Sequence, residues 1–138
     1  TSEQLTKIQS QLGTKLKVED LKDIATAEQV LTACHGHTKY LESHFTRAQD
    51  WIAYQLETLI KAANFIDNGY KEWTADFTNH NTYKYIPWFE RLSGGWSLDH
   101  VYVFGSFSGC PVWMYYKNRD TAKKIVEMHL QLYRKHLG

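Results

Sequence analysis

Cysteine and histidine, the side chains that bind zinc most readily, gather in one short stretch of the chain: Cys34, His35 and His37, with His44 a few residues further on. A structural zinc site takes four such ligands, usually from two closely spaced pairs. The spacing here matches no familiar zinc finger, and no second pair is evident. We therefore expect a polar cluster at a helix end and no cofactor, with zinc binding as the less favoured alternative.

A second group of reactive side chains lies further along, where Asp99 and His100 are adjacent and Ser106, Ser108 and Cys110 follow. Neighbouring residues of a strand point to opposite faces of a sheet, so Asp99 and His100 are predicted to form a poor acid–base pair. The serines have no G-x-S-x-G turn around them and no base partner nearby in sequence. The sequence therefore predicts a protein that is not an enzyme.

Aromatic side chains are concentrated between Tyr83 and Tyr116, which hold eleven of the twenty in the chain beside only four charged residues. Such rings supply much of the burial energy of a small domain, and exposed rings stack on flat ligands such as nucleotide bases. Basic residues at the strand ends would meet phosphates, and a histidine would add a hydrogen bond. For each single ring, a place in the core is the competing interpretation. The residues predicted to bind a ligand are Lys84, Trp88, Arg91, Trp96, His100, Tyr102, Trp113 and Tyr115.

Length and charge exclude several classes of protein. With 138 residues, 43% of them hydrophobic and 22% charged, the chain has the size and composition of one soluble globular domain. The net charge of +1 offers no basic excess for binding a nucleic-acid polymer. No apolar run is long enough to span a membrane, and the first residues do not form a signal peptide. We expect a cytoplasmic protein with two reduced cysteines and no membrane partner.

Two helical regions precede the aromatic stretch and must support it. The first is a helical N-terminal segment over residues 1–37, in which apolar residues recur at helical spacing. Thr26 and Gln29 match a capping box, in which two side chains satisfy the first free N–H groups of a helix. A helix is therefore predicted from about Ala27 to Cys34.

The clearest helix of the sequence is predicted over residues 38–69 and ends at Asn68-Gly69, because glycine readily adopts the left-handed conformation of a helix end. Its predicted role is to cover one face of a sheet. Trp51 and Tyr54 lie off its apolar stripe, where they either widen the buried face or project toward a partner. The apolar stripe consists of Phe45, Ala48, Ile52, Leu56, Leu59, Ala63 and Ile66.

The aromatic stretch is predicted as an antiparallel sheet over residues 83–117. Ser93-Gly94-Gly95 is a turn signal, and Pro87 favours a sheet edge because proline cannot donate a hydrogen bond to a neighbouring strand. Alternation places Trp96, Leu98, His100, Tyr102 and Phe104 on one face of the second strand. The three predicted strands cover residues 84–91, 96–104 and 112–117.

One domain over residues 1–138 accounts for all of these elements, since the chain shows no internal repeat and no low-complexity linker. A helix over 119–137, capped by Asn118 or Asp120, is predicted to complete it. The fold class is therefore predicted as α+β. It combines N-terminal helices, one of them long and amphipathic, with an antiparallel meander of about three strands and a C-terminal helix.

The run Lys84-Tyr85-Ile86-Pro87-Trp88-Phe89 is followed by a glycine and aromatic strand pair and then by a helix that contains Ala122 and Tyr133. This arrangement resembles a widespread set of small phage and prophage proteins that carry a K-Y-x-P-W-F element and have no assigned function. Their helix before the element is similar to residues 53–64. The resemblance covers roughly residues 45–137. It implies a phage origin, action in the host cytoplasm and no assigned catalysis.

These features predict a phage-encoded counter-defence protein that binds and sequesters a small nucleotide-type ligand through an aromatic surface with basic residues at its rim. Two alternatives stay open. One is a protein-interaction module that blocks a host defence or regulatory protein, and the other is a small nucleotide-processing enzyme. A homo-oligomer is also expected, because pairing of two copies often buries open strand edges and aromatic faces.

Overall fold

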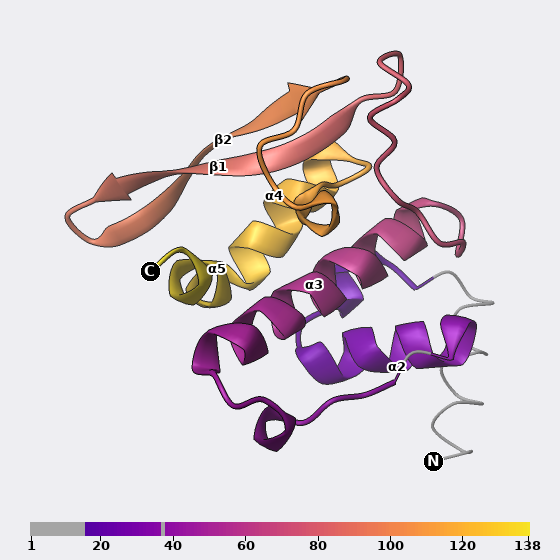
Figure 1. Ribbon diagram of the computed structural model, residues 1–138, viewed down its shortest axis with the longest axis vertical. Helices are drawn as coiled ribbons and strands as arrows, with labels where there is room; N and C mark the ends of the chain where they lie inside the picture. Colours follow the sequence, from indigo (N-terminus) through magenta and orange to yellow (C-terminus); the bar gives the residue numbers. More distant parts are fainter. Residues whose placement is uncertain (1–15, 37) are drawn as a thin grey trace.

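The computed structural model describes residues 16–36 and 38–138, with the main chain only for 33–35. In this part of the chain, α3 lies between α2 on one side and α4 and α5 on the other, and a β-hairpin covers the far side of α4 and α5 (Figure 1). Helices and an antiparallel sheet thus share one structure, and the predicted α+β class is confirmed. The elements are η1 (Val18–Asp20), α2 (Ile24–His35), η2 (Glu42–His44), α3 (Ala48–Asp67), β1 (Lys84–Leu92), β2 (Gly95–Phe104), η3 (Val112–Met114), α4 (Arg119–Met128) and α5 (Leu130–Leu137).

The N-terminal helix α2 is present, but it begins three residues earlier than the capping box of Thr26 predicted. Asp23 is the N-cap, and its carboxylate accepts a hydrogen bond from the Thr26 N–H at 2.9 Å. The Thr26 hydroxyl donates to the same carboxylate oxygen at 3.1 Å, so Thr26 belongs to the first turn. The helix ends at Gly36, whose φ of 66° is left-handed, as glycine permits.

The long helix α3 begins at Ala48 and not at residue 38, as the sequence predicted. Residues 38–47 instead contain the short turn η2 and fold back along the first half of α3, where the Phe45 ring lies 5.4 Å from that of Tyr54. Its end is as expected, with Gly69 at a φ of 67°. The buried residues concentrate in the second half of the helix: Leu56, Thr58, Leu59, Ile60, Ala62, Ala63, Asn64 and Phe65.

The hairpin pairs β1 with β2 in antiparallel fashion around the predicted Ser93–Gly94 turn. The register shifts at one point, because Trp88 pairs with His100 but Phe89 pairs with Leu98. Asp99 is therefore the extra residue of a β-bulge. The bulge interrupts the side-chain alternation, so Leu98 and the buried Val101 both pack against the helices. His100 and the residues after it turn to the opposite face from the one that strict alternation predicts.

The prediction of a third strand over residues 112–117 is wrong. Pro111 precedes the 3-10 turn η3 there, and only Tyr116 reaches β1, through a pair of hydrogen bonds with Tyr85 at 2.9 and 2.7 Å. The side chain of Asn64 holds this segment to α3. Its Nδ2 donates to the Tyr115 carbonyl at 2.9 Å, and its Oδ1 accepts from the Lys117 N–H at 2.9 Å. Because these main-chain groups of Tyr115 and Lys117 are hydrogen-bonded to Asn64, they are not available to pair with a neighbouring strand.

The predicted C-terminal helix is divided into α4 and α5 at His129, whose φ of −125° and ψ of 34° lie outside the helical range. The ring of His129 explains the break, because its Nε2 lies 2.7 Å from the Leu21 carbonyl and ties the junction to the N-terminal segment. Asn118 caps α4, as predicted, by accepting hydrogen bonds from the N–H groups of Asp120 and Thr121.

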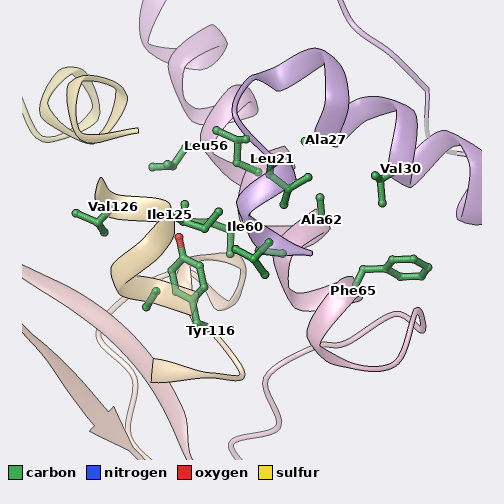
Figure 2. Close-up of a cluster of buried hydrophobic side chains, with 14 of the residues drawn as sticks. Leu21, Ala27, Val30, Leu56, Ile60, Ala62, Phe65, Tyr116, Ile125 and Val126 are labelled. Carbon is green, nitrogen blue, oxygen red and sulfur yellow. The ribbon is translucent and has the colours of Figure 1, made fainter. Parts of the chain in front are cut away.

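The core lies where α2, α3 and α4 meet the segment around Tyr116. Figure 2 shows side chains from all four parts converging, among them Val30, Ile60 and Ile125. Each fully buried leucine or isoleucine stabilises the fold by roughly 2 kcal/mol. Tyr116 is buried with them, and its hydroxyl pairs with that of Tyr133 at 2.6 Å. Burial raises the pKa of both tyrosines above the usual range, so both hydroxyls stay neutral.

Candidate functional site

The face of the hairpin turned away from α4 and α5 carries three of the predicted ligand-binding residues: Trp88, His100 and Tyr102. The ring centroids of Trp88 and Tyr102 are 5.1 Å apart, and those of His100 and Tyr102 are 3.9 Å apart. Trp88 is 48% exposed and Tyr102 is 43% exposed. We call these three residues the hairpin ring cluster. They form an exposed aromatic surface on one side of a two-stranded sheet.

Asp99, the extra residue of the bulge, joins this surface through His100. Its Oδ2 lies 2.6 Å from the Nδ1 of His100. The prediction that these two neighbours point to opposite faces is wrong, because it assumed a regular strand and the bulge removes the alternation. Both side chains are about half exposed, so water screens the pair and it contributes little to stability. The pair does, however, place the Asp99 carboxylate beside the rings of this surface.

Lys84 and Tyr115, two further predicted ligand-binding residues, lie in the interior. Lys84 is 1% exposed, and its Nζ donates to the carbonyls of Asn79 and Gly105, each at 2.8 Å. It therefore ties together the segments that flank the two strands. The Tyr115 ring is equally buried and packs edge-on to Phe77, with centroids 4.9 Å apart. Lys84 is not in a position to meet an external ligand, and Tyr115 reaches a possible ligand only where it lines the pocket beside α3.

Arg91 and Trp96 pair across the hairpin on the side of α5. The Arg91 guanidinium lies 5.7 Å from the centre of the Trp96 ring, a cation–π distance. The Trp96 indole N–H donates to the Gly138 carbonyl at 2.9 Å, and Arg134 donates to the Trp96 carbonyl at 2.8 Å. These contacts attach the hairpin to the end of α5. The bulge thus separates Trp96 from His100 and Tyr102, which the sequence placed on one face.

Trp113, the eighth predicted residue, lines a pocket of about 540 Å³ beside α3. The walls come from α3, from residues 72–75 and from residues 112–115. Trp73 and Trp113 supply half-buried rings, and Lys61 supplies a cation that pairs with Glu57 at 3.0 Å. The volume falls within the range of about 300–1,000 Å³ that is typical of small-molecule sites.

A second group of rings, which the sequence did not assign to a site, lies at the start of α3. Tyr40, Phe45 and Tyr54 line a pocket of about 340 Å³. We call them the α3 ring cluster. The available signal was the position of Tyr54 off the apolar stripe. Its partners could not be found from the sequence, because residues 38–47 were predicted as part of the helix itself.

A smaller pocket of about 200 Å³ lies between β1, residues 110–114 and the end of α5. His136 lines it, and its buried Nδ1 has no hydrogen-bond partner among the described residues. Burial lowers the pKa of His136 below its usual value, so the imidazole is neutral at pH 7. The ring instead packs edge-on to Trp113, with centroids 5.9 Å apart.

Other reactive side chains noted in the sequence have structural partners. Ser108 Oγ donates to the Cys110 carbonyl at 2.8 Å and pairs with the Tyr115 hydroxyl at 2.9 Å. His44 Nδ1 accepts a hydrogen bond from the Leu41 N–H at 3.1 Å. Within residues 16–36 and 38–138, no group of three or more His, Cys, Asp or Glu side chains is placed to hold a metal ion. The prediction of a polar cluster falls on side chains outside the described residues, namely those of Cys34, His35 and His37.

Comparison with protein-family models, with curated proteins and with solved structures finds no match for this chain. The resemblance to phage proteins therefore stays a prediction. In the part of the chain that the structure describes, none of the helices combines the length and the apolar character that crossing a bilayer requires.

Proposed function

We propose that this protein is a binding module whose hairpin ring cluster contacts a partner protein. One observation carries the proposal: the hairpin packs on α4 and α5 with one face, while on the other, beside the part that residues 73–77 and 110–115 cover, the Trp88 and Tyr102 rings stay half exposed. Tryptophan and tyrosine are over-represented among the residues that dominate the free energy of protein interfaces. Exposed aromatic surface of this kind on a small domain is typical of an interaction site.

A protein partner suits this face better than a nucleotide, because the predicted basic rim is not there. Lys84 is buried beneath flanking segments, and Arg91 stacks on Trp96 on the helix side. The nearest charge that the contacts place beside the rings is the Asp99 carboxylate, which would repel a phosphate. Trp88 also lines the pocket of about 200 Å³, but His100 and Tyr102 are not part of its lining, so most of the cluster presents a sheet face to a partner.

The resemblance to phage proteins supplies a setting for this module. A phage-encoded protein of this size would act in the host cytoplasm, where the partner would be a host defence or regulatory protein. A second copy of the chain is the competing occupant of the same face, and it would give the homo-oligomer that the sequence predicts.

Capture from host-cell extract on the immobilised protein tests the proposal. We expect one host protein to be retained by the wild type and lost from Trp88→Ala and from Tyr102→Ala. Phe107→Ala is the matched control, because Phe107 is 81% exposed and lies outside the cluster, after β2. A partner that binds the wild type and all three variants equally would show that this face is not the interface, and the proposal would be wrong.

Light scattering on the same proteins separates the two occupants. A monomer at high concentration supports the heterologous partner. A dimer that Trp88→Ala dissociates, while Phe107→Ala does not, would assign the face to a second copy of the chain and overturn the host-protein proposal.

Sequestration of a nucleotide-type ligand is the second candidate, and the pocket beside α3 is the place that favours it. Trp73 and Trp113 offer rings there, and Lys61 offers a cation, within a volume suited to a small molecule. Calorimetric titration with cyclic and ADP-ribose nucleotides tests it. Heat with the wild type that is lost in Lys61→Gln and kept in Lys71→Gln would support it, and no heat with any nucleotide would rule it out. Turnover of a bound nucleotide would favour the enzyme alternative.

A further inference from the structure

The α3 ring cluster has the chemistry of a cation site. Its pocket is formed by two stretches of chain that the fold brings together, residues 40–45 and the first half of α3. Asp50, Tyr54 and Glu57 are spaced by four and three along α3, which places them on one face of the helix. The lining residues are Tyr40, His44, Phe45, Asp50, Ala53, Tyr54 and Glu57.

Three rings meet there, and one of them stands steeply across the other two. Phe45 and Tyr54 are tilted by 32° with centroids 5.4 Å apart, and together they form one wall. Tyr40 stands at 89° to Tyr54 and at 71° to Phe45, with centroids 5.6 and 6.1 Å away. The face of an aromatic ring carries the negative part of its quadrupole, which attracts cations. A cation in this corner would therefore lie close to more than one ring.

A buried carboxylate stands behind the wall. The Tyr54 hydroxyl donates to Glu28 Oε1 at 2.7 Å; Glu28 is only 3% exposed, and its Oε2 lies 3.6 Å from the Nζ of Lys39, a more exposed cation. The Tyr40 N–H donates to the same hydroxyl at 3.1 Å, which links the two walls of the corner. Burial, together with Glu28, raises the pKa of Tyr54, so the phenol keeps its proton and stays a donor. Donation to a carboxylate makes the ring richer in electrons and its face more attractive to a cation.

Two carboxylates complete the site at its rim. Asp50 and Glu57 line the pocket, and each is paired with a basic residue of its own helix region, Arg47 at 3.7 Å and Lys61 at 3.0 Å. Such exposed pairs are worth only a few tenths of a kcal/mol, so either carboxylate is free to turn toward a ligand. Rings and carboxylates both disfavour an anion. The pocket lining does contain oxygen and nitrogen donors, but among the described residues no three His, Cys, Asp or Glu side chains are grouped so that they could hold a metal ion.

From these contacts we propose that the α3 ring cluster binds an alkylammonium group, such as a trimethylammonium head. Methyl groups on the nitrogen make the cation poorly hydrated and suit it to aromatic walls, whereas a bare ammonium keeps its water. A pocket of about 340 Å³ holds such a head with part of its chain. The group could belong to a free small cation or to a methylated lysine side chain. This site is separate from the hairpin ring cluster and does not depend on the function proposed there.

Choline and its neutral isostere 3,3-dimethyl-1-butanol test the charge requirement, because they have the same shape and differ in the positive nitrogen. We expect choline to bind the wild type at least tenfold more tightly than the alcohol in calorimetry. Its methyl resonance should also move upfield in proton NMR, since it would lie over the ring faces. Equal binding of the alcohol, or no binding of any alkylammonium at millimolar concentration, would overturn the proposal.

Variants test the location. Tyr40 is about half exposed, so Tyr40→Leu keeps the fold and should weaken choline binding by about three- to tenfold, the range for loss of one cation–π contact. Tyr83→Leu is the matched control, because Tyr83 is an exposed tyrosine outside the pocket lining. Unchanged affinity in both Tyr40→Leu and Glu57→Gln would place the site elsewhere and refute the assignment.

A peptide with one trimethyllysine distinguishes the two sources of the group. Binding of the peptide tenfold tighter than choline, and tighter than the same peptide with unmodified lysine, would assign the site to a modified protein. Equal affinities for choline and the methylated peptide would support a site that reads the free head group. Tight binding of the unmodified peptide alone would contradict the proposed chemistry.

Discussion

The hairpin ring cluster and the α3 ring cluster are built from similar side chains, yet they differ in shape and in the charge around them. Trp88 and Tyr102 stand half exposed on the face of the hairpin turned away from α4 and α5, beside the exposed Asp99–His100 pair. Tyr40 and Tyr54 meet at a right angle inside a pocket, with the buried Glu28 behind them. The number of aromatic rings in a cluster therefore does not identify the ligand of that cluster. The two proposals differ because the first set of rings lies half exposed on a sheet and the second lines a pocket, with different charges beside each.

Two buried charged side chains, Lys84 and Glu28, can be compared in the same way. Removal of Lys84 should have the largest effect on the stability of the fold. Lys84→Met leaves the Asn79 and Gly105 carbonyls without their donor, and we expect a loss of about 2–4 kcal/mol in the free energy of unfolding. Urea unfolding followed by circular dichroism measures it. Lys123→Met, at an exposed position, is the control and should change little. An unchanged midpoint in Lys84→Met would mean that the two carbonyls do not need this clamp.

Removal of Glu28 is the equivalent change behind the α3 ring cluster and should cost less. Glu28→Ala leaves the half-buried Tyr54 hydroxyl without its acceptor and Lys39 without its ion-pair partner, so we expect a loss of about 2 kcal/mol. Glu28→Gln keeps an acceptor and should lose only about 1 kcal/mol, but choline should bind it more weakly because the negative charge is gone. Equal choline affinity in wild type and Glu28→Gln would show that Glu28 acts on the fold alone.

Changes in the exposed rings should have a smaller effect on stability and should separate the two clusters by function. Trp88→Ala and Tyr102→Ala remove half-exposed rings, so we expect losses of at most about 1 kcal/mol in urea unfolding. Both variants should bind choline like the wild type. Tyr40→Leu, in turn, should retain the captured host protein. Loss of both choline binding and host-protein capture in any one of these variants would mean that the two clusters are coupled. That result would contradict separate roles for them.

The smallest effect concerns His136, on the helix side of the hairpin. Its pKa is lowered in the folded protein, so the unfolded chain takes up the proton first as the pH falls below about 6.5. The contribution of neutral His136 to the free energy of unfolding is therefore complete above about pH 6.5, and it decreases as the solution becomes more acidic. Thermal unfolding between pH 7.5 and 5 should show a shallower decrease for His136→Phe than for His80→Phe, a matched change at an exposed histidine. Parallel curves would contradict this role.

Local patterns in the sequence were enough to predict much of the fold. The apolar stripe of α3 and its end at Gly69 depend on neighbours three and four residues apart. The structure confirms the end and buries Leu56, Leu59 and Ala63 of the stripe, whereas Phe45 precedes the helix and Ala48 is exposed. The turn at Ser93–Gly94 and the pairing of the first two strands follow from equally local signals. The candidate site was harder to predict. Only Trp88, His100 and Tyr102 of the eight residues form an exposed ring surface.

Local spacing predicts the α+β class, the long helix and the aromatic-rich hairpin, because helical periodicity, strand alternation and turn residues act over a few positions. Only the tertiary structure decided which rings are free. The bulge at Asp99 turns the side chains of the second half of β2 to the opposite face of the sheet. Asn64 binds residues 115–117 to α3, where a third strand was predicted. The fold-back of residues 38–47 creates the α3 ring cluster. Each of these outcomes depends on contacts between residues far apart in the chain, which no local pattern specifies.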